Sequence, residues 1–176
     1  MPFELVKLEL LPGAFNASLF EGVVEAVKDR GIVLTTLAQL GNTVAQQRHM
    51  FELNRVCAAD IPERGEFHTW DQYVERRIEV PSFDPEGVVV ALDDHRWVGM
   101  SATSYRGGNS YAFGDMTGVL RSHRGRQLAL AMKVRGMAWA TADGRRTVRT
   151  VHHPANAPII ALNRRLGYTD ASWPYP

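Results

Sequence analysis

The 176-residue chain lacks several features that would each define a class of protein. Its single cysteine, Cys57, excludes an intrachain disulfide and a zinc site built from several cysteines. No apolar run approaches the roughly 20 residues of a membrane-spanning helix. The amino terminus alternates charged and apolar residues, unlike a secretory signal. We therefore expect a cytoplasmic protein with neither a metal site nor a membrane partner.

Neither sign of charge dominates the chain. Twenty Lys and Arg residues against 19 Asp and Glu residues leave a formal net charge of +1 at pH 7. This balance gives no electrostatic reason to expect a nucleic-acid partner. The length suits one domain with a sizeable core, and either a monomer or a homodimer agrees with it.

The apolar pattern predicts an ordered series of strands and helices. Alternation over 3–11 predicts a half-buried strand, and Ser18 followed by Glu21 is a capping-box pattern before a short helix. Turn residues at 107–109 and 143–144 separate later elements. The other expected elements are strands 32–37, 88–92, 97–105, 110–120 and 147–151, and helices 42–58, 70–78, from about 125 to 142, and 158–166. This order predicts a mixed α+β sheet.

The most informative segment is Thr117 to Ala129, TGVLRSHRGRQLA. A strand runs directly into a short basic turn containing Gly125, and a helix begins immediately afterwards. Backbone N–H groups at a helix start lack intrahelical partners, and the helix dipole adds positive charge there. The junction therefore favours an anion such as a pyrophosphate. On residue types alone, a solvated basic turn explains the segment equally well, and no Walker or G-x-G-x-x-G motif occurs.

Residues 119–129 resemble the coenzyme A motif R/Q-x-x-G-x-G/A of the GNAT (GCN5-related N-acetyltransferase) superfamily, with Arg124 first and Ala129 last. Residues 156–168, NAPIIALNRRLGY, are similar to its N-x-x-(M/A)-x-x-x-(N/Y)-x-x-L-G-F element. Two motifs in this order are more specific than either alone. The resemblance implies the GNAT fold, an α+β fold whose mixed, mostly antiparallel sheet is splayed at its centre and flanked by helices. It covers 115–168 closely.

The resemblance also implies a reaction, the transfer of an acetyl group from acetyl-CoA (or another short acyl-CoA) directly to a primary amine of a small-molecule acceptor. The cofactor would enter the gap between the parted strands, its pantetheine arm on the backbone of Thr117 and Val119 and its pyrophosphate on the following N–H groups. The residues expected to bind it are Thr117, Val119, Leu120, Arg121, Arg124, Gly125, Arg126, Gln127, Leu128, Ala129, Asn156 and Asn163.

Two residues are candidates for the general base, Asp115 on the strand before the cofactor loop and His152 at the end of the next strand. An imidazole titrates near neutral pH and suits deprotonation of an ammonium. A backbone N–H at Val119 or Leu120 would polarise the thioester carbonyl. For Asp115 and His152 alike, the alternative to a catalytic role is an ordinary solvent-exposed position on the surface. A tyrosine acid at 163 is excluded, because that residue is Asn163.

The acceptor pocket is expected to come from residues 54–80 and from the strands after them. Acidic and aromatic side chains in this segment predict an acidic, aromatic-lined cleft for a cationic amine, although solvated helix faces explain the same charges. The residues expected to contact the acceptor are Asp60, His68, Trp70, Tyr73 and Tyr105.

Several departures from the family pattern stand out. Gln127 replaces the first glycine of the coenzyme A motif, and the prolines near Pro176 disfavour the usual final strand. We predict an N-terminal strand–helix extension over 1–30 and a GNAT domain over 31–176 with a shortened C-terminal strand. The sheet then lacks its closing edge, or a partner subunit or the strand at 3–11 supplies it. Rival functions are a protein lysine or N-terminal acetyltransferase and a degenerate, non-catalytic GNAT module.

Overall fold

The computed structural model describes residues 4–108, 110–142 and 146–174. Seven strands form one sheet in the order β2-β3-β4-β5-β6-β1-β7. Neighbouring strands are antiparallel, except β5 and β6, which are parallel. The strands are β1 (Val6–Leu10), β2 (Ile32–Thr36), β3 (Val88–Asp93), β4 (Arg96–Arg106), β5 (Tyr111–Val119), β6 (Thr147–His152) and β7 (Thr169–Asp170). The mixed α+β sheet is confirmed.

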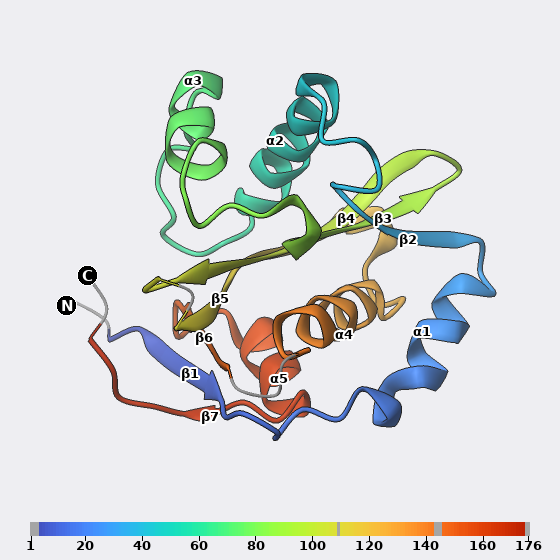
Figure 1. Ribbon diagram of the computed structural model, residues 1–176. Coiled ribbons are helices and arrows are strands. Elements are labelled where there is room, and N and C mark those ends of the chain that lie inside the picture. Colours follow the sequence, from blue (N-terminus) through green and yellow to red (C-terminus); the bar gives the residue numbers. More distant parts are fainter. Residues whose placement is uncertain (1–3, 109, 143–145, 175–176) are drawn as a thin grey trace.

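Helices cover both faces of this sheet (Figure 1). One face carries α1 (Glu21–Lys28), α4 (Leu128–Ala140) and α5 (Ala157–Arg165). The other face carries α2 (Val44–Ala58) and α3 (Trp70–Tyr73), which continues as the π-helical segment η2 (Val74–Ile78). Short 3₁₀ turns are η1 (Ala17–Phe20), η3 (Pro85–Gly87) and η4 (Arg121–His123). In the described ranges, no helix is long and apolar enough to cross a membrane.

Most elements fall within a few residues of the expected ranges, and one cap differs. The side chain of Asn16 accepts a hydrogen bond from the Ser18 backbone N–H at 3.1 Å and caps η1. The expected capping box at Ser18 is therefore wrong, because the amide of Asn16 reaches the backbone two residues on. The expected turn residues Asn109, Asp143 and Gly144, and the terminal residues Phe3, Tyr175 and Pro176, lie outside the described residues.

Strand β1 supplies the closing part of the sheet. It pairs with β6 along its whole length, from Val6 opposite His152 to Leu10 opposite Val148, and with the two-residue β7 on its other edge. Leu8 and Leu10 are fully buried in the core. The N-terminal strand thus fills the edge position beside β6 for which the sequence left three alternatives. β1 therefore belongs to the same sheet as the strands that follow residue 30.

Strands β5 and β6 pair only at their first residues. Their register runs from Tyr111 opposite Thr147 to Phe113 opposite Arg149. Beyond it, β5 continues to Val119 with no strand of the described chain on that side. The Oγ1 of Thr150 donates to the Gly114 carbonyl at 3.0 Å where the strands part. The sheet is therefore splayed at its centre, as the resemblance implies.

Candidate active site

A cleft of about 800 Å³ opens where β5 and β6 part. It is bounded by the end of β5, the start of α4, the residues after α2, and α5. Eight of the expected cofactor residues line it, namely Thr117, Val119, Arg124, Gly125, Gln127, Leu128, Ala129 and Asn156. We call this the cofactor cleft.

The backbone of β5 presents polar groups to the cofactor cleft. The Leu120 N–H donates to the Val98 carbonyl of β4 at 2.9 Å. Because bonded and non-bonded pairs alternate in antiparallel strands, Val119 and Thr117 direct their N–H and C=O groups away from β4. The Val119 carbonyl accepts a hydrogen bond from Arg124 Nε at 3.0 Å. Leu120 is thus already bonded and cannot polarise a thioester, whereas Thr117 and Val119 face the gap.

The first turn of α4 leaves its backbone N–H groups open to the same cleft. Gln127 precedes the helix with φ of 63° and makes no side-chain capping hydrogen bond. A left-handed φ is costly for any residue with a Cβ, which explains why the family motif has glycine here. The Gln127 side chain is exposed and does not close the junction. The helix start therefore remains a site for an anion.

The carboxylate of Asp60 gathers two arginines at the rim of the cofactor cleft. Arg121 and Arg124 both form ion pairs with it, and these hydrogen bonds hold the pKa of Asp60 well below its usual range. The segment after α2 runs past the end of β5, so Asp60 lines the cofactor cleft and not the acceptor pocket predicted for it. Leu120 and Arg121 line a shallow hollow beside this rim.

Two other expected contacts lie elsewhere. Arg126 does not line the cofactor cleft, and its carbonyl accepts a weak hydrogen bond from Arg30 at 3.5 Å. Asn163 is fully buried on α5, with its Nδ2 2.7 Å from His152 Nε2. It therefore holds the imidazole and does not face the cofactor.

His152 is poorly suited to the role of base. It does not line the cofactor cleft, because Asn163 and Thr150 contact its Nε2 from the interior. Burial, and then the charge of Lys133, lower the pKa of His152 to about 4. The ring is neutral at pH 7 and binds a proton only weakly, so the geometry disfavours His152 and leaves Asp115 as the candidate.

Sequence reasoning missed Lys133 on α4. It is only 3% exposed, and no acidic side chain of the described residues pairs with its ammonium. Burial lowers its pKa to about 8. A Cβ placed on Gly114 would lie 3.7 Å from its Nζ, which puts the ammonium where β5 and β6 part. Its three- and four-residue spacing from Leu130 and Met137 was the available signal, since it places Lys133 on the buried helix face.

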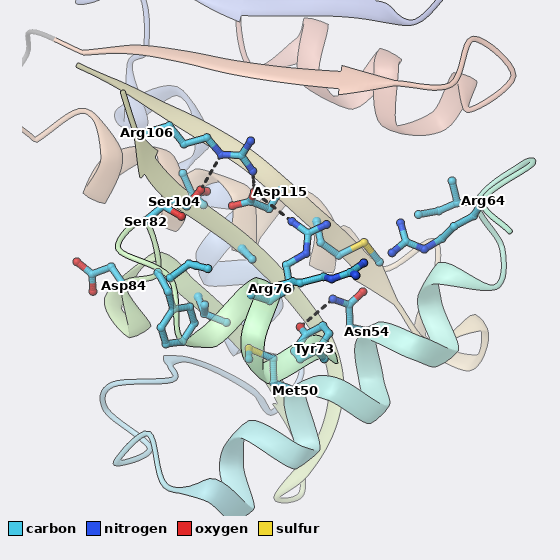
Figure 2. A pocket seen from close by; sticks show the side chains of 18 residues that line it. Met50, Asn54, Arg64, Tyr73, Arg76, Ser82, Asp84, Ser104, Arg106 and Asp115 are labelled. Carbon is cyan, nitrogen blue, oxygen red and sulfur yellow. Dashed lines mark hydrogen bonds and ion pairs between the residues drawn. The ribbon is translucent and has the colours of Figure 1, made fainter. Parts of the chain in front are cut away.

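A second cleft, of about 410 Å³, opens on the α2–α3 face of the sheet (Figure 2). Asp115 and Met116 of β5 line it, and Thr117, the next residue, lines the cofactor cleft. Ile61 lines both clefts. The two clefts therefore lie side by side at β5, and we call the second one the acceptor cleft because it is the candidate site for an acceptor.

A β-bulge places Asp115 in the acceptor cleft. In the β4–β5 ladder, Ala102 lies opposite Met116 and Thr103 lies opposite Gly114, so Asp115 is the extra residue. Bulges redirect side chains and are common beside active sites. The Asp115 carboxylate forms an ion pair with Arg106, and Figure 2 shows both side chains at one wall of the cleft.

The acceptor cleft is basic, so the predicted acidic cleft is wrong. Four arginines line it against two carboxylates, Asp84 and Asp115. The arginines are Arg64, Arg76, Arg77 and Arg106. Two acidic side chains between α2 and α3 point away from this cleft. Asp60 pairs with the arginines of the cofactor rim, and Glu63 lies 3.6 Å from His153.

Most of the predicted aromatic acceptor residues pack against other parts of the protein and do not line the cleft. Tyr73 lines the cleft, but its buried hydroxyl accepts a hydrogen bond from Asn54 at 2.9 Å. Trp70 packs edge-on against Phe51, with ring centroids 5.6 Å apart. Tyr105 stacks on Trp139 of α4, and His68 lies beside Phe67; Trp70, Tyr105 and His68 line neither main cleft.

The sequence of the chain is similar to that of one curated acetyltransferase. No protein-family model matches the chain. The curated mycothiol acetyltransferase of Clavibacter michiganensis subsp. michiganensis is 31% identical over 121 residues, 68% of this chain and 38% of that protein. The chain thus spans under two fifths of that relative.

Solved structures agree with the fold. A GCN5-related N-acetyltransferase from Sphaerobacter thermophilus is 20% identical with a TM-score of 0.63, over 95% of this chain and 48% of that one. The structure of AAC(6')-Iy with a CoA bisubstrate analog is 17% identical with a TM-score of 0.60, over 82% of this chain and 95% of that one. The chain has the GNAT fold, and these similarities support its resemblance to the GNAT superfamily. The Clavibacter and Sphaerobacter proteins are described as acetyltransferases.

Proposed function

We propose that this chain is an N-acyltransferase that moves an acetyl group from acetyl-CoA directly to a primary amine of a small molecule. One observation carries the proposal: the cofactor cleft and the acceptor cleft lie side by side on β5, where Met116 lines one and Thr117 lines the other. A donor in one cleft and an amine in the other would meet there, and holding both in place supplies much of the rate enhancement.

The residues of the cofactor cleft fit coenzyme A. The open N–H groups from Gly125 to Ala129 would hold its pyrophosphate at the start of α4. The outward backbone groups of Thr117 and Val119 would bond the pantetheine arm, and Asn156 lines the same space. Acetyl-CoA would supply a thioester. The amine nitrogen would bond to its carbonyl carbon, the C–S bond would break, and coenzyme A would leave as a thiolate that takes up a proton.

The residues at the junction match what direct transfer requires. The amine must lose a proton, and the thioester carbonyl must be polarised. Asp115 lines the acceptor cleft two residues before Thr117 and would accept the ammonium proton, directly or through water. The backbone N–H of Thr117 or Val119 would polarise the carbonyl. The ion pair with Arg106 fixes the orientation of the Asp115 carboxylate.

A non-catalytic module that binds coenzyme A is the second candidate. It is favoured by Asp60, whose carboxylate occupies both rim arginines and lowers their attraction for phosphates. The mycothiol acetyltransferase and the AAC(6')-Iy complex with an acetylneamine analog support the catalytic candidate and a small-molecule acceptor.

Two measurements separate these candidates. Calorimetry with coenzyme A tests the cofactor cleft, and release of free thiol from acetyl-CoA in the presence of an amine panel tests transfer. We expect saturable binding and amine-dependent release. Binding without release for any amine would favour the non-catalytic module. The absence of binding at millimolar coenzyme A would contradict both.

A further inference from the structure

The acceptor cleft holds more cationic charge than its own carboxylates neutralise. Arg106 pairs with Asp115, and Arg77 lies 4.0 Å from the same carboxylate. Asp84, the other carboxylate of the lining, accepts a hydrogen bond from the Glu86 backbone N–H at 2.9 Å. Asp115 is therefore shared between two guanidinium groups, and the remaining arginines have no carboxylate partner in the cleft.

Arg64 and Arg76 are those remaining arginines. Among the described residues, neither has an acidic group within ion-pair distance. Arg64 lies over the Phe67 ring at 5.2 Å, a contact that positions the guanidinium without neutralising it. Figure 2 shows Arg64, Arg76 and Arg106 reaching towards the same space from three segments of the chain. Guanidinium groups so arranged are suited to bidentate binding of a carboxylate or phosphate.

The backbone that carries Arg76 is itself irregular. Glu79 N–H donates to the Val74 carbonyl, five residues earlier, at 2.8 Å, which defines the π-helical turn η2. Such turns are rare and occur frequently at functional sites. Arg76 and Arg77 both line the cleft from this turn. Glu75 and Glu79 belong to the same stretch of chain but do not line the cleft.

A neighbouring group registers the positive potential. Partial burial, and then the charges of three arginines of the acceptor cleft, lower the pKa of His68. A cationic ligand that entered the cleft would be repelled by the same arginines. An anion would meet attraction, and an anion that also carried an amine would bring that amine towards Asp115.

We propose that the acceptor is an amine that also carries an anionic group, a carboxylate or a phosphate, and that Arg64 and Arg76 bind this group. The inference rests on the proposed acyl transfer and specifies its acceptor. It replaces the cationic amine that the sequence suggested. The rest of the lining, which includes Met50, Phe83 and Val88, would pack against the carbon skeleton.

Matched amine pairs test the proposal. Acetyl transfer would be measured for phosphoethanolamine against ethanolamine, and for a set of amino acids against their carboxamides. We expect the anionic member of at least one pair type to have a kcat/KM about tenfold higher or more. The phosphate and carboxylate arms show which anion is preferred. Preference for the members that lack the anionic group throughout, or for polyamines, would overturn the inference.

Variants locate the effect. Arg64→Gln and Arg76→Gln should each lower kcat/KM for the amine with the anionic group about tenfold, mainly by raising KM. They should change kcat/KM for the partner that lacks this group less than about twofold. Arg55→Gln is the matched control, because Arg55 is an exposed α2 arginine paired with Glu52 outside the cleft. An equal loss for both members of a pair would show a structural role and overturn the inference.

A binding measurement keeps the inference separate from the proposed function. If no amine is acetylated although coenzyme A binds, the proposed function fails. Protein saturated with coenzyme A would then be titrated with inorganic phosphate and with succinate, for the wild type and for the double variant Arg64→Gln/Arg76→Gln. Binding that the double variant loses would support an anion site. Binding equal in both proteins, or absent from both, would overturn it.

Discussion

The two clefts are built from different parts of the chain. The cofactor cleft offers backbone groups, the first amides of α4 and the outward edge of β5, while its rim arginines are held by Asp60. The acceptor cleft offers guanidinium groups and the Asp115 carboxylate. Backbone donors persist whatever side chain is present, so Gln127 can stand where related motifs have glycine. Acceptor recognition, by contrast, depends on individual side chains and should change with single substitutions.

The largest expected effect is on transfer alone. Asp115→Asn removes the proposed base, and kcat/KM should fall about 10³-fold, within the usual range for general-base catalysis. Coenzyme A affinity should be unchanged, because Asp115 does not line the cofactor cleft. Asp84→Asn, at the other carboxylate of the acceptor cleft, is the control. Thiol release and calorimetry measure the two quantities, and a weakened affinity for coenzyme A in Asp115→Asn would break the division between the clefts.

The next effect concerns the buried ammonium of Lys133, which lies in neither cleft. Lys133→Met should raise the free energy of unfolding at pH 7 by about 3 kcal/mol, since a pKa of about 8 in the fold against 10.5 in the unfolded chain reflects the cost of burying the charge. The unfolded chain binds the extra proton between these values, so wild-type stability should rise relative to the variant from pH 8 to 10.5.

Urea unfolding of both proteins at several pH values measures this difference. Cys57 and Tyr168, whose pKa values burial raises, occur in both proteins, so their titration cancels. A stability difference that stays constant up to pH 10.5 would show that the fold does not lower the pKa of Lys133.

A smaller effect separates His152 from the chemistry. Its pKa of about 4 in the fold lies below the ordinary 6.5, so the unfolded chain binds more protons between these values and stability should fall as pH falls through this window. At pH 5 the loss should be about 2 kcal/mol, and His152→Asn should remove it. The pH dependence of kcat/KM should not change. A shifted pH–rate profile in the variant would restore His152 as a candidate base.

The smallest effect belongs to the cofactor rim. Asp60→Asn frees Arg121 and Arg124 and removes a negative charge from the cleft, so coenzyme A should bind about fivefold more tightly at low salt, with the gain shrinking as salt screens it. Calorimetry at two salt concentrations measures it. The KM for the acceptor should stay the same. Weaker binding would mean that Asp60 positions the arginines for the phosphates.

The sequence predicted what depends on nearby residues. Hydrophobic periodicity located the strands and helices, and the segment 117–129 contains both the strand end and the helix start of the cofactor cleft. The acceptor cleft could not be found in this way, because Arg64, Arg76 and Arg106 are brought together only by the packing of α2 and η2 on β4. The acidic residues of segment 54–80 led to the wrong prediction of an acidic cleft, because composition does not say which way a side chain points.

The sequence also predicted the first strand, but it left the position of this strand in the sheet as one of three alternatives. Its alternation showed that one side is buried, but pairing partners far along the chain leave no local signal. His152 was misjudged for a related reason. The residue type suggested a base near neutral pH, while its burial against Asn163 is a property of the folded packing.

The position of β1 has a consequence for folding. This strand precedes the other strands of the sheet in sequence, yet both of its partners, β6 and β7, come after every other strand. Such distant pairing requires a long loop to close and is expected to be slow. Until it forms, the free edge of β6 is open to pairing with another chain. Aggregation during folding should therefore depend on how quickly β1 pairs with β6.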